Sequence, residues 1–183
     1  MAFEAITLEG KNVSAELDSC IYNAMLGFSG VLKFGNNLGY EIVTSNEIKI
    51  KDGLLINQGR FARINPGSTH SVPIRSGRAG VTRYDLIVAH FETDGALTET
   101  HEIRVIEGMA NGPAPQATTG DVFKGAMINE LPLYLVKLNG IYIESVTPKF
   151  TVYGSLFDMA NRIKYGHGEP HDLNPGEIYI ELE

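Results

Sequence analysis

The chain has 183 residues, 43% of them hydrophobic, which is enough to bury a core and suggests one domain with or without an appendage. Its 15 basic and 22 acidic residues give a net charge of -7 with no Lys/Arg run, which argues against nucleic acid and membrane as partners. The single cysteine, Cys20, excludes an intramolecular disulfide and indicates synthesis in a reducing compartment. The N-terminal MAFEAITLEG has no basic region followed by an apolar run, so we expect no signal peptide.

A single helix is predicted over about residues 14–26. Ser14 is a suitable N-cap and Gly27 a suitable stop, with acidic residues in the first turn. Helical spacing aligns one apolar stripe: Leu17, Cys20, Ile21, Ala24 and Met25. We expect this stripe to dock on the rest of the chain, and the place of Cys20 on it favours packing over a catalytic thiol.

Short apolar runs broken by turn signals fill most of the remaining sequence. Three Asp-Gly or Asn-Gly pairs are each flanked by strand-like runs, which predicts hairpins centred on 52–53, 94–95 and 139–140. Repeated hairpins favour a mainly β fold, namely an antiparallel β-sandwich of jelly-roll type, over a βαβ fold.

Two further segments complete the predicted organisation. GMANGPAPQATTG, residues 108–120, is rich in Pro and Ala and is predicted to be an extended crossover between sheets or edges. After Phe150 we predict a short helix around Leu156 to Ile163 and a terminal strand in EIYIELE. Residues 1–150 then form the β-sandwich domain, and 151–183 form a segment for oligomerisation or attachment.

One candidate metal site depends on the register of the second hairpin. With a two-residue turn at Asp94-Gly95, side-chain alternation places His90, Glu99 and His101 on one face, where they could bind a metal. With a three-residue loop, His101 moves to the opposite face. Because half-buried or solvent-facing strand residues explain the pair of histidines more simply than a metal site does, we assign no metal ligand, catalytic residue or cofactor.

Other polar and aromatic groups have alternative roles. HGEPHD, with His167, Glu169, His171 and Asp172, could take up metal, but Gly168 and Pro170 break the helix that would align the histidines, which favours a turn. Five arginines could clamp an anion or form ion pairs between subunits: Arg60, Arg63, Arg75, Arg78 and Arg83. Four tyrosines could stack on sugar rings if they share a face: Tyr142, Tyr153, Tyr165 and Tyr179.

The order of these segments resembles tail or baseplate structural proteins of siphophages and of prophages in Gram-positive bacteria. The resemblance covers roughly residues 15–150 and includes a strand of the RxDLIV type, a hairpin and a Pro/Ala-rich crossover. It is carried by Arg83, Asp85, Gly108, Pro113, Pro115, Leu133 and Val136. The C-terminal YGHGEPHDLNPGEIYI is also similar to segments of phage fibre and neck-appendage proteins.

The resemblance implies a virion component without enzymatic activity, located in the phage tail and acting as a homo-oligomer, often a trimer, that contacts other tail or baseplate proteins. Contact with a host cell-surface glycan is a further implication. The chain lacks a coiled-coil or β-helical shaft, so an adaptor or compact baseplate piece fits better than a complete fibre. The alternatives are a carbohydrate-binding adhesin and, third, a metal-dependent enzyme of double-stranded β-helix type.

Overall fold

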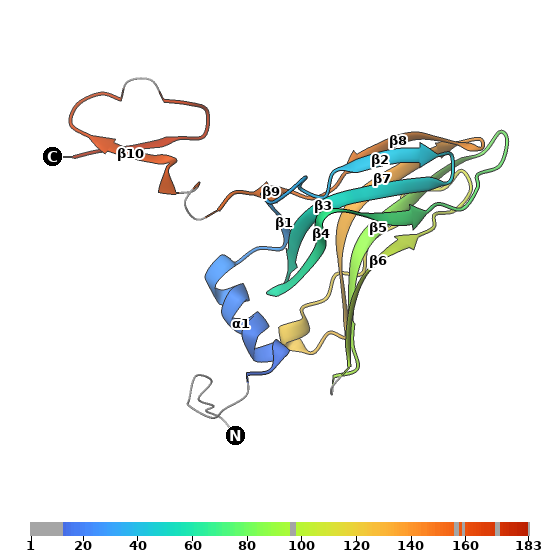
Figure 1. Ribbon diagram of the computed structural model, residues 1–183, viewed down its shortest axis with the longest axis horizontal. Helices are drawn as coiled ribbons and strands as arrows, with labels where there is room; N and C mark the ends of the chain where they lie inside the picture. Colours follow the sequence, from blue (N-terminus) through green and yellow to red (C-terminus); the bar gives the residue numbers. More distant parts are fainter. Residues whose placement is uncertain (1–12, 96–97, 156–157, 159, 171–172, 183) are drawn as a thin grey trace.

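The computed structural model describes residues 13–95, 98–155, 158, 160–170 and 173–182, and most of them form two facing β-sheets (Figure 1). The first sheet contains β1 (Gly30–Leu32), β2 (Tyr40–Thr44), β3 (Glu47–Asn57), β4 (Arg60–Pro73) and β9 (Val152–Tyr153). The second has the order β6-β5-β7-β8 and contains β5 (Thr82–Thr93), β6 (Glu99–Ile106), β7 (Ile128–Asn139) and β8 (Tyr142–Pro148). The predicted mainly β fold class with antiparallel sheets and one α-helix is confirmed.

The hydrophobic core lies between the two sheets. It contains residues of both sheets that are almost fully buried, among them Ile48, Ile50, Ile87, Leu133 and Val136. One side of the sandwich is closed by a group of rings, in which Tyr134 contacts Tyr40 and Phe150 edge to face. The other side, between β4 and β6, has a cavity of about 270 Å³ over Leu55 and Ala89.

The helix α1 (Ala15–Leu26) begins and ends where the sequence predicts. Ser14 Oγ accepts a hydrogen bond from the N–H of Leu17 at 3.2 Å, and Gly27 has φ 67° and donates to Asn23 O at 2.8 Å. The apolar stripe docks only in part: Leu17, Cys20 and Ile21 are half-buried, whereas Met25 is 68% exposed, and the one fully buried residue of the helix is Ser19. The helix approaches the sandwich with its backbone at Ser19, against Gly59.

The first predicted hairpin is misplaced. Asp52 and Gly53 lie inside β3 and have no positive φ, whereas the turn to β4 is at Gln58 and Gly59, with φ 46° and 77°. Gly53 is needed for close packing, since an added Cβ would clash with the backbone N of Leu38. The Asp-Gly pair thus marks a bulge where another segment approaches the strand.

The other two hairpins exist, with shifted loops. The last β5–β6 pair is Thr93 with Glu99, so five residues separate the strands and neither the two-residue nor the three-residue loop is correct. The last β7–β8 pair is Asn139 with Tyr142, which makes Gly140-Ile141 the loop instead of Asn139-Gly140.

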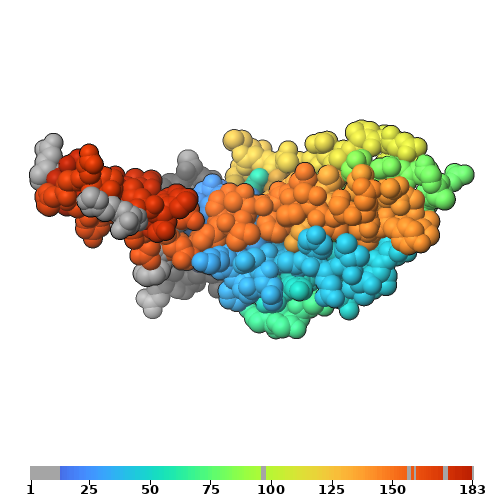
Figure 2. Space-filling view, turned by 90° about the horizontal axis from the view of Figure 1, so that it is seen from above, coloured from blue at the N-terminus to red at the C-terminus, as the bar shows by residue number. Residues whose placement is uncertain are grey.

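The predicted crossover runs from β6 to the far side of β5 and ends in a short 3-10 helix, η1 (Val122–Lys124). Beyond β9, the strands β10 (Ile163–Gly166) and β11 (Ile178–Glu181) form a separate two-stranded parallel sheet. This C-terminal sheet projects from the sandwich in both views (Figures 1 and 2). The terminal strand in EIYIELE is confirmed; of the expected helix, residues 156, 157 and 159 lie outside the described residues, and Ile163 belongs to β10.

Within the described residues, no helix has the length and apolar character needed to cross a membrane.

Candidate functional site

The structure separates the predicted metal triad. The β5–β6 register pairs Phe91 with His101 and Thr93 with Glu99, so Glu99 and His101 share a face, and His90 points to the other face. The cause is the five-residue loop, in which the Asp94 N–H donates to Thr98 O and the Thr98 N–H donates to Asp94 Oδ1, both at 3.1 Å. Across the described residues, no group of three or more His, Cys, Asp or Glu side chains is arranged to hold a metal ion.

His90 belongs to a buried polar cluster that the sequence did not predict. Its Nδ1 lies 2.8 Å from Glu130 Oε1, and its Nε2 lies 2.8 Å from Arg104 Nη1 and 3.2 Å from Glu92 Oε2. The second oxygen of Glu130 accepts the N–H of Thr118 at 2.6 Å, which fastens the crossover to β7. Burial by itself would raise the pKa of Glu130, but the Thr118 N–H and His90 outweigh it and hold the pKa below its ordinary value. The cluster is a structural clamp.

Arg83 and Asp85 form a second buried clamp, at the opposite end of β5. The Asp85 carboxylate accepts two hydrogen bonds from Arg83, both at 2.9 Å, and one from the N–H of Gly108 at 3.1 Å. The Arg83 guanidinium also donates to the backbone oxygens of Arg75 and Ser76. Three residues that carry the family resemblance therefore meet in one structural unit, which holds the 74–81 loop and the start of the crossover.

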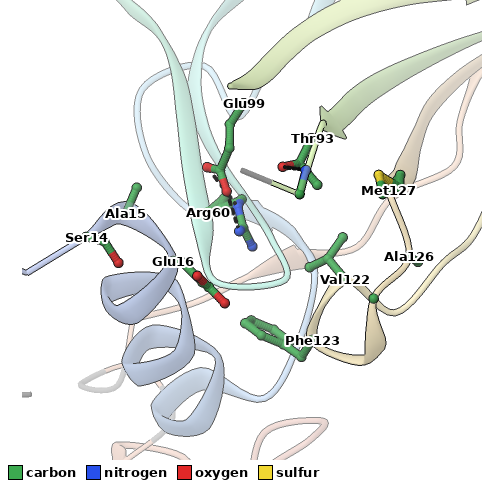
Figure 3. Close-up of a pocket in the computed structure, with 12 residues that line it drawn as sticks. Ser14, Ala15, Glu16, Arg60, Thr93, Glu99, Val122, Phe123, Ala126 and Met127 are labelled. Atoms are coloured by element: carbon green, nitrogen blue, oxygen red, sulfur yellow. Dashed lines mark hydrogen bonds and ion pairs between the residues drawn. The ribbon is translucent and has the colours of Figure 1, made fainter. Parts of the chain in front are cut away.

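Arg60 occupies the space between the sandwich, α1 and η1 (Figure 3). Its Nη2 and Nε lie 2.7 and 3.3 Å from the two carboxylate oxygens of Glu99, and its guanidinium lies 4.3 Å from the centre of the Phe91 ring. A cavity of about 590 Å³ borders this pair, with Glu16 of α1 and Phe123 of η1 on its wall. Since Arg60 already has a carboxylate and an aromatic partner, it is not a vacant anion clamp.

His101 lies next to Arg60 in a smaller cavity of about 370 Å³ against α1. Burial, together with the positive charge of Arg60 and the nearby His90, lowers the pKa of His101 to about 4, so the ring is neutral at pH 7. Its Nε2 and the Nη1 of Arg60 are buried without a hydrogen-bond partner within the described part of the chain. Arg60 is permanently charged and has no lone pair for a metal, and His101 lies in no group of three potential ligands within the described residues.

The remaining candidates do not converge. Of the five arginines, Arg75 pairs with Glu107 at 3.2 Å, whereas Arg63 and Arg78 are exposed. Tyr153 stacks on Phe28 at 3.9 Å, and the other three tyrosines lie on β8, β10 and β11. No shared sugar-stacking face results.

HGEPHD lies in the connection between β10 and β11, as the turn interpretation expects. His167 Nδ1 lies 2.8 Å from Leu182 O, whereas His171 and Asp172 lie outside the described residues.

The C-terminal sheet has an exposed apolar face. Its register pairs Ile163 with Ile178 and Tyr165 with Ile180, so these four side chains share one face. All four are exposed: Ile163 by 45%, Ile178 by 61%, Tyr165 by 74% and Ile180 by 50%. Leu182 continues this apolar face and is 43% exposed. A two-stranded sheet with one uncovered apolar face is at best marginally stable alone in water.

The opposite face of the same sheet has Tyr179 opposite Lys164 and is otherwise charged, with the charge divided between its strands. Arg162 and Lys164 lie on the β10 side, and Glu177 and Glu181 lie on the β11 side. Lys164 Nζ and Glu177 Oε1 are 3.7 Å apart. The base of this face borders a cavity that Lys33 and Asp158 also line. Among the described residues, the apolar face is the one that stays exposed.

Comparison with known proteins adds no family: no family model matches the chain, and no curated protein matches it significantly.

Proposed function

We propose that this protein is a non-enzymatic assembly component that works in multiple copies, of the kind found in phage tails and prophage baseplates. The sandwich serves as a rigid scaffold, and residues 151–183 attach it to its neighbours. The proposed form is a homo-oligomer in the virion, with the trimer that the sequence resemblance implies. The proposal rests mainly on one observation, the uncovered apolar face of the C-terminal sheet.

The energetics favour burial of this face. Fully burying an Ile side chain contributes about 1.5–3 kcal/mol, and the face has three Ile residues beside Tyr165 and Leu182. The described chain leaves each of these side chains more than two-fifths exposed. A contiguous exposed apolar patch is typical of protein interaction sites. Weak contacts of this size become effective when several copies engage together.

Light scattering on the purified full chain tests the proposal through Ile178→Arg. The wild type is expected to have the mass of several chains, and the variant the mass of one, because a charge in the apolar face prevents burial. Val43→Arg is the matched control, since Val43 is an exposed β-branched residue of β2, 42% accessible, and lies outside the C-terminal sheet. A wild type that stays monomeric at high concentration contradicts the proposal, as does an Ile178→Arg variant that assembles normally.

One observation favours a second candidate, a carbohydrate-binding adhesin. Tyr22 of α1 and Phe61 of β4 meet edge to face, with 5.1 Å between ring centres, on the wall of the cavity that contains His101. Aromatic walls with a few polar groups are typical of small-ligand sites. Retention on cell-wall glycan that is lost in Phe61→Ala would support this function, and no retention of the wild type would argue against it.

A further inference from the structure

The two open edges of the C-terminal sheet differ in a way that specifies a partner. The N–H of Ile178 donates to Arg162 O at 2.7 Å and the N–H of Leu182 donates to Gly166 O at 2.8 Å. Because alternate residues of a strand direct their backbone groups to the same side, the N–H and C=O groups of Ile163 and Tyr165 face the open edge of β10. Those of Tyr179 and Glu181 face the open edge of β11. Both edges are thus able to accept a further strand.

Charge disfavours pairing between like edges. If two copies met β10 to β10, Lys164 and Arg162 would lie beside the same basic side chains of the second copy. If they met β11 to β11, Glu177 and Glu181 would lie beside acidic side chains. Like charges across a strand pair are destabilising, whereas opposite charges stabilise it.

Pairing between unlike edges satisfies both faces at once. When β10 of one copy lies along β11 of the next in parallel, Lys164 is directly or diagonally opposite Glu177 and Glu181 of its neighbour. On the other face, Ile163 and Tyr165 continue the apolar surface beside the neighbour's Ile178 and Ile180. The chain thus carries both complementary halves of one interface.

We propose that the partner covering this sheet is a second copy of the chain, whose β10 pairs in parallel with the β11 edge of the first, head to tail. The proposal rests on the assembly function above and names the partner and the mode of contact. A heterologous contact repeats until it closes a ring or extends as a filament. In a ring, the continuous sheet encloses its apolar face, which removes both open edges and the exposed isoleucines together.

Cysteine cross-linking distinguishes the two modes of pairing. Two variants are made in a Cys20→Ala background, one with Tyr165→Cys on β10 and the other with Ile180→Cys on β11. The two proteins are unfolded, mixed, refolded together and oxidised. Peptide mass spectrometry then identifies the disulfides that form between chains. Head-to-tail pairing gives the mixed 165–180 disulfide between chains. Predominant 165–165 or 180–180 disulfides overturn the proposal, as does the absence of any disulfide in mixtures that still assemble.

Charge reversal provides an independent test by light scattering. Lys164→Glu is expected to weaken association about fivefold, because it places a carboxylate beside the acidic strand of the neighbour, and adding Glu181→Lys should restore part of it. The loss of the Lys164–Glu177 contact contributes little, since Lys164 is half exposed. Lys149→Glu, at an exposed residue after β8, is the control.

The outcomes separate this proposal from the assembly function. If Ile178→Arg abolishes assembly but Lys164→Glu does not weaken it, the C-terminal sheet mediates assembly and the head-to-tail pairing is wrong. If the wild type is a monomer, both are wrong.

Discussion

Removing the charge of Asp85 should destabilise the fold more than any surface substitution of equal size. In Asp85→Asn the Arg83 guanidinium, whose side chain is 10% exposed, loses the buried carboxylate that it contacts twice at 2.9 Å. Breaking a buried ion pair by changing one partner typically costs 3–5 kcal/mol. Glu107 lies 3.3 Å from Arg83 and compensates in part, so we expect a loss near the lower limit, about 3 kcal/mol.

Urea unfolding followed by far-UV circular dichroism measures this loss at a fixed protein concentration, because assembly makes stability depend on concentration. Arg75→Met is the control: the Arg75 side chain is 77% exposed, and loss of its ion pair with Glu107 should cost about 1 kcal/mol or less. An Asp85→Asn variant within about 1 kcal/mol of the wild type would refute the view that Arg83 and Asp85 clamp the loop and crossover.

Two further predictions concern the end of the sandwich near α1. The pKa of His101 is about 4 in the folded chain, so between pH 6.5 and 4 the His101 ring binds a proton mainly in the unfolded chain. The free energy of unfolding should therefore fall by about 2–3 kcal/mol as the pH is lowered over that range. In His101→Gln the fall should be smaller. Urea unfolding at several pH values checks this, and an equal fall in His101→Gln and in the control His70→Gln would contradict it. Gly59→Ala should cost clearly more than the roughly 1 kcal/mol expected of Gly67→Ala, since both have positive φ but only Gly59 abuts Ser19. Equal urea midpoints for these variants would show that α1 does not depend on that contact.

Local chemistry explains what the sequence predicted well. The bounds of α1 depend on Ser14 and Gly27, which act within one helical turn. The hairpin β7–β8 also depends on neighbouring residues, although its loop lies one residue later than predicted. The fold class follows from these local patterns, because several hairpins with alternating strands leave few arrangements other than stacked antiparallel sheets.

Contacts between distant segments explain some of the errors. The Asp-Gly pair at 52–53 has the composition of a turn, but the approach of Leu38 makes it part of a strand, and the turn falls at Gln58-Gly59. The error over His90 and His101 has a local cause instead. The loop of five residues is three residues longer than the two-residue turn, an odd difference that reverses the faces, whereas the three-residue alternative placed His101 on the opposite face correctly.

The partners of His90 on β7 and β6, Glu130 and Arg104, are distant in sequence and could not be predicted from it. Arg83, in contrast, pairs with Asp85 only two residues along β5. The amphipathic character of the C-terminal sheet was partly readable, since EIYIELE alternates. The parallel pairing of β11 with β10, which creates the single apolar face, could not be predicted from the sequence, because the face depends on the register between the two strands.

Hydrogen exchange at four backbone amides tests the central claim most directly. The N–H groups of Ile163, Tyr165, Tyr179 and Glu181 face the open edges of the C-terminal sheet and have no partner strand in the described part of one chain. If copies assemble through these edges, all four amides in the intact chain should exchange slowly at high concentration and faster on dilution. Rapid exchange of all four at every concentration would contradict assembly through this sheet.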